Sequence, residues 1–211
     1  MKIKWLGHSC FLITAADGSR ILTDPPVKEV GYELPPEEAD ILTTSHKHYD
    51  HYNIKGVKGN FVHIENPGEY EHKGIAVKGI STFHDTEGGA KRGSNTIFVF
   101  EVDGLKICHC GDLGHILTQQ QISAIGNIDV LLIPVGSVFT VNYLDAAEIM
   151  EILSPKITIP MHYKTKALTF ELDKVDKFLS VVDGREYTAN EIEINRDNLE
   201  DYPPVVVLNY K

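Results

Sequence analysis

The sequence predicts an α/β protein, with α+β character, in which two β-sheets pack face to face and helices cover their outer faces. Three observations predict this class. The first half of the chain is a series of short strands, helical patterns are clear only in the second half, and strands alternate with the helices there. The length of 211 residues falls in the range of one large domain. We therefore expect residues 1–211 to form a single domain.

Short apolar runs bounded by turn residues predict the strands of the first half. Asp17-Gly18 and Asp103-Gly104 are hairpin turn signals, and an apolar run follows each of them. The expected strands cover residues 2–6, 10–14, 20–23, 41–44, 61–64, 75–83, 96–102 and 105–108.

Capping patterns predict two helices of the second half. Thr118 followed by Gln121 is a capping box. Asp145 followed by Glu148 repeats the pattern and predicts a helix over residues 146–153, which ends before a proline.

The rest of the second half contains one further helix pattern and several strand patterns. Residues 168–181 have the apolar spacing of an amphipathic helix. Strands are expected over residues 130–134 and 157–160. The tail from Tyr187 is acidic and then apolar at residues 205–208, which fits a final strand, an arm or an interface.

The composition restricts the partners. Hydrophobic residues make up 42% and charged residues 24%, an ordinary globular balance, and the formal net charge is −10. Such a field repels phosphate backbones, so the sequence disfavours nucleic acid as a partner. Two divalent ions would add about four positive charges locally, which leaves a small anionic substrate open.

The cysteines and the apolar runs predict a soluble, cytoplasmic protein. Cys10, Cys108 and Cys110 form no disulfide framework of the kind that small secreted domains need. Polar residues interrupt the N-terminal apolar stretch, so no clean signal-peptide core is present. No apolar run approaches the roughly 20 residues that cross a bilayer, so no membrane association is expected.

The segment from His46 to His51 carries the main chemical signal. It places His46, His48, Asp50 and His51 within six residues. Neutral imidazoles with a carboxylate suit zinc, manganese or iron better than calcium or magnesium. The alternatives are a polar surface loop or an adventitious metal site.

Other candidate ligands follow expected strands directly. His84 ends the strand expected at residues 75–83, and Asp112 and His162 follow two further strands. Loops at the carboxyl ends of strands are where rigid scaffolds gather functional residues. We therefore expect these side chains to meet the motif at one site.

These motifs resemble the metallo-β-lactamase superfamily. His46-x-His48-x-Asp50-His51 looks like its signature, and the spacing to His84, Asp112 and His162 resembles its hydrolase branch, shared by glyoxalase II-like enzymes and tRNA 3′-processing ribonucleases. The segments 5–11 and 111–115 resemble small prokaryotic Zn-dependent hydrolases related to the L-ascorbate-6-phosphate lactonase group. The resemblance covers almost the whole chain and implies a four-layer αβ/βα sandwich with the site at one edge of the sheets.

The resemblance also implies how the ligands are shared. His46, His48 and His84 would hold one ion, Asp50, His51 and His162 a second, and Asp112 would bridge them. Flavodiiron relatives carry a carboxylate at the position of His48, so this histidine favours hydrolysis over oxygen reduction. Asp24 resembles an acidic motif of the family that orients a ligand histidine; alternatively, it is a turn acid before a proline.

Two residues are candidate catalytic residues, Asp50 and His8. Asp50 would bind metal and orient the nucleophile. His8 matches a Gly-His-Ser motif of the subgroup, which implies a position near the metals as substrate contact or proton donor, although a turn residue is the alternative. We interpret His63, His72, His109 and His115 as structural. A cysteine ligand would require Asp112 to be misassigned.

Two glycine-bearing segments, residues 134–140 and 85–94, are candidates for the border of the pocket. The second carries two cations that could steer an anionic substrate, or it is a solvated loop. Lys164 is a similar candidate.

The function expected from these features is hydrolysis. A hydroxide bridging two divalent ions, Zn²⁺ first with Mn²⁺ or Fe²⁺ as alternatives, would attack an ester, lactone, thioester or phosphodiester of a small molecule, and an anionic substrate is left open. The alternatives are a metal-binding or metal-sensing protein without turnover, and an iron-dependent redox enzyme. Relatives range from monomers to larger rings, which leaves a homo-oligomer open.

Overall fold

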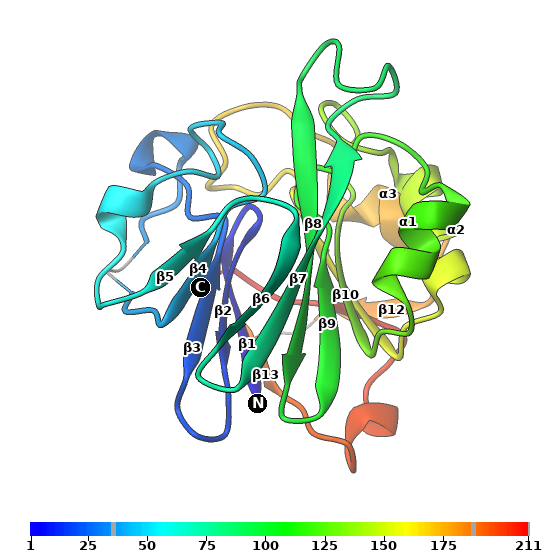
Figure 1. The fold of residues 1–211 in the computed structure, drawn as a ribbon. Coiled ribbons are helices and arrows are strands. Elements are labelled where there is room, and N and C mark those ends of the chain that lie inside the picture. Colours follow the sequence, from blue (N-terminus) through cyan, green and yellow to red (C-terminus); the bar gives the residue numbers. More distant parts are fainter. Residues whose placement is uncertain (35–36, 187–188, 211) are drawn as a thin grey trace.

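The computed structural model describes residues 1–34, 37–186 and 189–210, in which two β-sheets face each other (Figure 1). The smaller sheet has the strand order β13 (Glu191–Glu193), β1 (Lys2–Gly7), β2 (Cys10–Thr14), β3 (Arg20–Thr23), β4 (Ile41–Thr43) and β5 (Val62–Ile64). The larger sheet has the order β12 (Gly184–Glu186), β14 (Val205–Val207), β11 (Ile157–Met161), β10 (Val130–Pro134), β9 (Leu105–His109), β8 (Ser94–Val102), β7 (Ile75–Phe83) and β6 (Gly68–His72). The predicted architecture of two facing sheets is confirmed.

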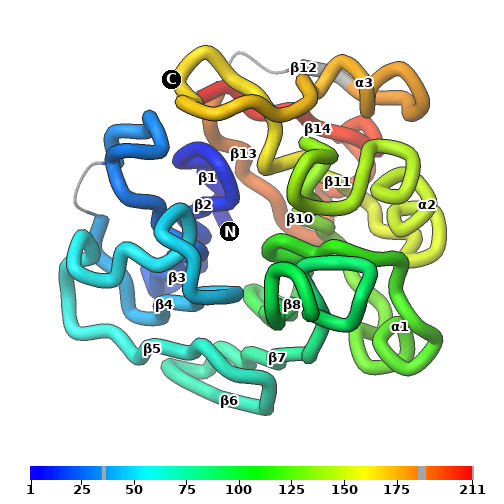
Figure 2. The backbone as a smooth tube through the Cα atoms, turned by 90° about the horizontal axis from the view of Figure 1, so that it is seen from above, coloured from blue at the N-terminus to red at the C-terminus, as the bar shows by residue number. Residues whose placement is uncertain are grey.

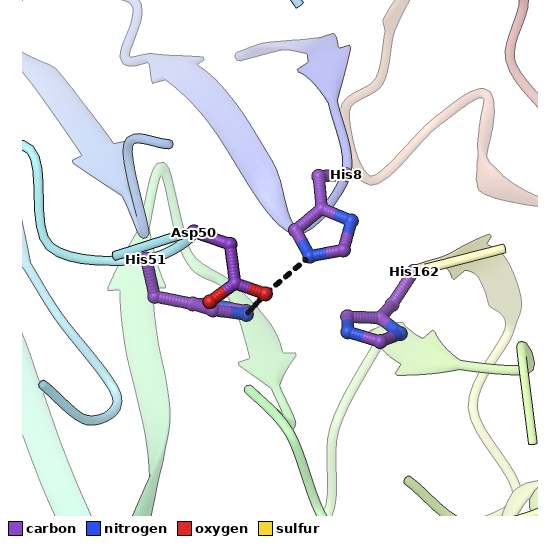
Figure 3. Close-up of side chains that lie close together, drawn as sticks. All are labelled: His8, Asp50, His51 and His162. Atoms are coloured by element: carbon purple, nitrogen blue, oxygen red, sulfur yellow. Dashed lines mark hydrogen bonds and ion pairs between the residues drawn. The ribbon is translucent and has the colours of Figure 1, made fainter. Parts of the chain in front are cut away.

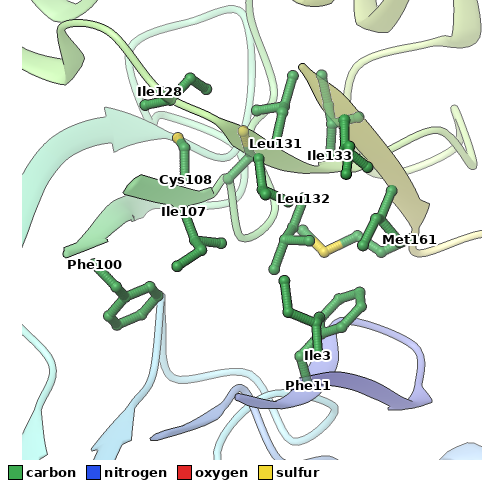
Figure 4. Packing of buried hydrophobic residues seen from close by; sticks show 14 of the residues in the cluster. Ile3, Phe11, Phe100, Ile107, Cys108, Ile128, Leu131, Leu132, Ile133 and Met161 are labelled. Atoms are coloured by element: carbon green, nitrogen blue, oxygen red, sulfur yellow. The ribbon is translucent and has the colours of Figure 1, made fainter. Parts of the chain in front are cut away.

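The hydrophobic core lies between the inner faces of the two sheets. Successive side chains of a strand point to opposite faces, so alternate residues of β1, β2, β9 and β10 meet in the middle. Ile3 and Phe11 of the smaller sheet lie opposite Ile107 and Leu132 of the larger sheet, and all four are fully buried (Figure 4). This packing fixes the position of one sheet, and of the loops at its edge, relative to the other.

The two outer faces are covered differently. Helices α1 (Gln119–Ile125), α2 (Tyr143–Leu153) and α3 (Val175–Leu179) lie on the outer side of the larger sheet (Figure 2). Over the smaller sheet, Leu12, Leu22 and Leu42 pack against Ile54 of the short 3-10 helix η2 (Ile54–Gly56) and against Leu34. The outer layer of this sheet is therefore formed by loops and a 3-10 turn within the described residues.

The start of α1 agrees with the prediction, and the start of α2 does not. The Thr118 hydroxyl accepts a hydrogen bond from the Gln121 N–H, and the Gln121 side chain accepts one from the Thr118 N–H. Helix α2 begins earlier than expected, because the Asn142 side chain accepts hydrogen bonds from the N–H groups of Leu144 and Asp145. The predicted cap at Asp145 is wrong, since an amide side chain three residues earlier caps the helix.

The helix expected over residues 168–181 is reduced to α3. The Lys164 ammonium donates hydrogen bonds to the carbonyls of Leu168 and Phe170 at 3.0 and 2.9 Å and pairs with Glu171. The Asp173 N–H donates to the Gly136 carbonyl at 2.9 Å. These partners hold residues 168–173 in an irregular loop, and they also give Lys164 a structural role in place of substrate steering.

The described part of the C-terminal tail contributes two strands and a turn, and β13 pairs with β1. Strand β14 pairs in parallel with both β11 and β12, so of the alternatives left open for residues 205–208 the structure adopts the strand. A 3-10 turn, η3 (Leu199–Asp201), precedes it. Tyr187, where the predicted tail begins, lies outside the described residues.

Every helix in the described ranges is too short or too polar to traverse a bilayer. A further 3-10 turn, η1 (Lys28–Val30), lies between β3 and β4.

Candidate metal centre

The strand directions bring the candidate ligands to one edge of the molecule. In the larger sheet β9, β10 and β11 are parallel, and β7 runs in their direction because both β7 and β9 are antiparallel to β8. His84, Asp112 and His162 each follow the end of one of these strands. In the smaller sheet β3 and β4 are parallel, and Asp24 and His46 follow their carboxyl ends.

A first group of donors consists of His46, His48 and His84. One ring nitrogen from each lies within 4.8 Å of the others, which is close enough for all three to bind one ion. His46 Nε2 and His48 Nδ1 are 3.0 Å apart. His46 and His84 are buried, whereas His48 faces solvent, so this group opens to the outside.

A second group consists of His8, Asp50, His51 and His162 (Figure 3). The His8 Nε2 atom lies 3.1 Å from Asp50 Oδ2, and the rings of His8 and His162 are 4.1 Å apart between centroids. His8, His51 and His162 are fully buried. The structure thus places His8 in direct contact with candidate ligands, as its predicted proximity to the site requires.

Asp112 lies between the two groups. Its Oδ2 atom is 3.1 Å from His84 Nε2 and 3.3 Å from His162 Nε2, and its Oδ1 atom is 3.2 Å from His51 Nε2. One carboxylate therefore faces imidazole nitrogens of both groups, which is the arrangement that a bridging ligand needs.

Asp24 is linked to one histidine of each donor group: to His51 directly, and to His46 through Ser45. Its carboxylate accepts from the Ser45 N–H at 2.7 Å, from the Ser45 hydroxyl at 2.6 Å and from His51 Nδ1 at 2.9 Å. The Ser45 oxygen lies 2.9 Å from His46 Nδ1. When the Ser45 hydroxyl donates to Asp24, the Ser45 oxygen accepts from His46 Nδ1–H, which leaves His46 Nε2 unprotonated. A neutral His51 would likewise keep its proton on Nδ1, beside Asp24, and offer Nε2 to a metal ion.

The electrostatics of the site fit divalent cations. Burial raises the pKa of Asp112, but His162 and His51 outweigh it and hold that pKa well below its usual range. Burial lowers the pKa of His46 to about 3, and that of His48 is lowered for the same main reason. Both imidazoles are therefore neutral near pH 7, the state in which histidine binds metal.

His51 shows the opposite shift. Burial lowers its pKa, but the carboxylates of Asp112 and Asp50 outweigh burial and raise it well above the usual value. The carboxylates around His51 thus favour a positive charge at this position, which a bound cation would supply. Among the described residues, His51 Nε2, Asp112 Oδ1 and His162 Nε2 are buried and form no hydrogen bond. Because buried polar atoms normally have partners, these orphaned atoms fit metal ligands.

The backbone at the site is held in uncommon conformations. His8, Asp24 and His162 have φ of 54°, 40° and 51°, in the left-handed region that residues with a Cβ rarely adopt. The His8 carbonyl accepts hydrogen bonds from the His162 N–H at 3.1 Å and the Trp5 indole at 3.0 Å, which ties two of these residues together. Such strain costs of the order of 1–3 kcal/mol per residue and is concentrated at functional sites.

Two residues outside the predicted site, Asn95 and His109, hold the site together. Asn95 accepts a hydrogen bond from the Asp112 N–H at 2.9 Å and donates to the Cys110 carbonyl. His109, which we interpreted as structural, donates from Nε2 to the Ser9 carbonyl at 2.8 Å and accepts from the Gly111 N–H. It thereby joins the turn that carries His8 to the loop that carries Asp112. The alternation of side chains along β9 could have indicated from the sequence which way His109 points, whereas no motif distinguishes Asn95.

The remaining candidates lie elsewhere. Cys108 and Cys110 are fully buried, and no cysteine belongs to a metal-binding group within the described ranges. His63 contacts the Thr44 hydroxyl, and His115 accepts from the Phe83 N–H. These contacts agree with the structural interpretation of the two histidines.

Comparison with known proteins finds relatives over most of the chain. A family model described as the β-lactamase superfamily domain matches residues 2–162. A metal-dependent hydrolase of Thermoplasma acidophilum is 30% identical, over 83% of this chain and 87% of that protein.

Solved structures show the same fold. A structure from Thermotoga maritima, described as a candidate Zn-dependent hydrolase of the metallo-β-lactamase superfamily, is 43% identical with a TM-score of 0.82, covering 98% of this chain and 97% of its own. A structure of a candidate metal-dependent hydrolase from Parabacteroides distasonis is 23% identical with a TM-score of 0.64, over 78% and 84% of the two chains, and shares the fold.

Proposed function

Since this chain is a metal-dependent hydrolase of the metallo-β-lactamase superfamily, we propose that it holds two divalent ions and cleaves an ester, lactone, thioester or phosphodiester bond in a small molecule. The observation that carries the proposal is the position of the Asp112 carboxylate between two groups of donors. Zn²⁺ is the first choice, with Mn²⁺ or Fe²⁺ as alternatives, because imidazole and carboxylate donors accept all three.

The residues have separate parts in the proposed reaction. When bound, divalent ions would supply an activated water and polarise the carbonyl or phosphoryl oxygen of the substrate. Asp24 holds His46 and His51 in the tautomers that leave Nε2 free, and Asp50 is anchored by His8. His8 can hold a proton at Nε2 and donate it to Asp50 Oδ2.

Several further features support a small substrate and an intracellular setting. The formal charge of −10 disfavours nucleic acid as the substrate. The cysteines are buried and unpaired, which suits a reducing compartment, and we include a cytoplasmic location in the proposal.

Metal analysis beside an activity screen tests the function. Protein purified without chelator should contain about two zinc, manganese or iron ions per chain and hydrolyse at least one substrate of a panel of esters, lactones, thioesters and phosphodiesters. Chelation should abolish the activity, and added metal should restore it. Two ions without turnover on any class would favour the metal-sensing alternative, and iron with redox activity would favour an oxidoreductase. Fewer than about half an ion, not restored by added metal, would contradict the ligand assignment.

His8→Asn should lower kcat about tenfold while metal content stays at the wild-type value. Asparagine tolerates the left-handed backbone at this position but cannot reproduce the imidazole contact to Asp50, and one hydrogen bond to a charged group has a value of about this size. Elemental analysis and kinetics on the best substrate of the panel measure the two effects. His72→Asn, in the hairpin between β6 and β7, is the matched control. Loss of one ion would instead make His8 a ligand, and an unchanged kcat would remove it from catalysis.

A further inference from the structure

A cleft adjoins the first donor group. Its volume is about 420 Å³, and its lining includes His46, His48 and Arg92, which lies in the loop between β7 and β8. Because His48 is exposed, a molecule in this cleft would reach the donor group directly. Arg92 therefore borders the space through which a substrate approaches.

Arg92 differs from the other cations near the site. Lys47 pairs with Glu65 at 3.2 Å and Lys91 pairs with Glu87. Lys164 is bound to carbonyls and to Glu171, as described above. The half-buried Arg92 guanidinium has no carboxylate within ion-pair distance in the described part of the chain, and so keeps its charge and its donors for a ligand.

Arg92 contacts an aromatic ring, and further ring contacts connect that ring to the second donor group. Its guanidinium lies 5.6 Å from the centre of the Phe139 ring. Phe139 and Phe170 are 6.0 Å apart, and Phe170 and His8 are 5.6 Å apart, between ring centroids. A line of aromatic rings thus runs from Arg92 to His8. Phe139 is 38% exposed, so this wall is open to a ligand.

Asp85 fixes the loop that carries Arg92. Its carboxylate accepts hydrogen bonds from the N–H groups of Glu87, Gly89, Lys91 and Arg92, all at 2.8–2.9 Å. The loop is therefore organised before any ligand binds, and ordering it adds no cost to binding.

We propose that Arg92 and the Phe139–Phe170 wall form a subsite for the anionic group of the substrate, a carboxylate or a phosphate carried on an apolar body. The planar guanidinium matches both anions through paired hydrogen bonds. In a chain of net charge −10, an arginine without an ion pair to a described residue, beside the donor groups, gives an anion a local attraction. This inference rests on the proposed hydrolase function and specifies its substrate class.

Calorimetric titration of the metal-loaded protein with phenyl phosphate and with phenylacetate tests the subsite. Arg92→Gln should raise the Kd of at least one of these anions about tenfold or more, since it removes a charge-assisted hydrogen bond. Lys91→Gln, which changes the neighbouring cation that pairs with Glu87, should leave both Kd values unchanged. The anion with the larger Arg92 dependence identifies the natural charged group as phosphate or carboxylate.

Two outcomes would overturn the subsite: the wild type binds neither anion, or Arg92→Gln and Lys91→Gln bind both as the wild type does. The readout is binding, so it separates the two proposals. Hydrolysis by the wild type together with anion binding that does not depend on Arg92 would contradict only the subsite. Arg92-dependent binding without hydrolysis of any substrate on the panel would contradict only the proposed function.

Discussion

Asp112→Asn should bind less than about one ion per chain and lose more than about 100-fold in activity. The carboxylate lies within 3.3 Å of Nε2 atoms of His51, His84 and His162, so its negative charge would attract an ion in either donor group. Asparagine keeps the shape but removes the charge and turns an N–H donor toward the nitrogens that bind metal. Loss of a residue that only supports a ligand already costs about 10–100-fold, and loss of a shared ligand should exceed that.

Elemental analysis and steady-state kinetics on protein loaded with excess metal measure these effects. Asp197→Asn, in an exposed turn after β13, makes the same chemical change away from the site and should behave as the wild type. A circular dichroism spectrum equal to that of the wild type would show that the Asp112 variant is folded. An Asp112 variant with two ions and nearly full activity would exclude a bridging role.

The clustering of the candidate ligands could be predicted because it depends on local sequence and on strand ends. Four side chains of the set lie within residues 46–51, and His84, Asp112 and His162 each follow an apolar run. Once those runs are strands of one direction, the topology alone brings the side chains to one edge. The proximity of these side chains can therefore be predicted without knowing how the core packs.

One wrong helix boundary, and two roles that the sequence did not show, depended on contacts that only the folded chain makes. The helix expected over residues 168–181 has the right apolar spacing, but Lys164 and Gly136 bind its first half as a loop. The role of Asn95 depends on where Asp112 arrives in three dimensions, 17 residues along the chain. Arg92 is one of two adjacent cations in the sequence, and only the fold shows that Lys91 is paired and Arg92 is not.

The structural surroundings of Asp24 could be predicted only in part from the sequence. Its sequence context allowed either a turn acid or a residue that orients a ligand. The structure gives it a turn-like backbone, with φ of 40°, and hydrogen bonds to Ser45 and His51. One residue therefore has both a turn-like backbone and hydrogen bonds to a candidate ligand and its neighbour, and its role in orienting a ligand stays a prediction.

Asp24→Asn should weaken metal binding by about 10–100-fold at both positions. Asparagine accepts the left-handed backbone and has the same size, so the change is confined to the hydrogen bonds and the negative charge of Asp24. Its amide nitrogen would face His51 Nδ1, which is itself a donor in the metal-binding tautomer. His51 would then have to move its proton to Nε2, the atom that lies 3.2 Å from Asp112. Competition with a fluorescent chelator measures the affinity.

Ser45→Ala separates the two branches of this network. It removes the link from Asp24 to His46 and keeps the hydrogen bond from His51 Nδ1 to Asp24. Only the ion of the first donor group should then bind more weakly, whereas Asp24→Asn should affect both ions. Equal losses at both positions in the two variants would mean that the whole site loosens as one unit. Unchanged affinity in Asp24→Asn would mean that the packing around His46 and His51 fixes their tautomers without the carboxylate.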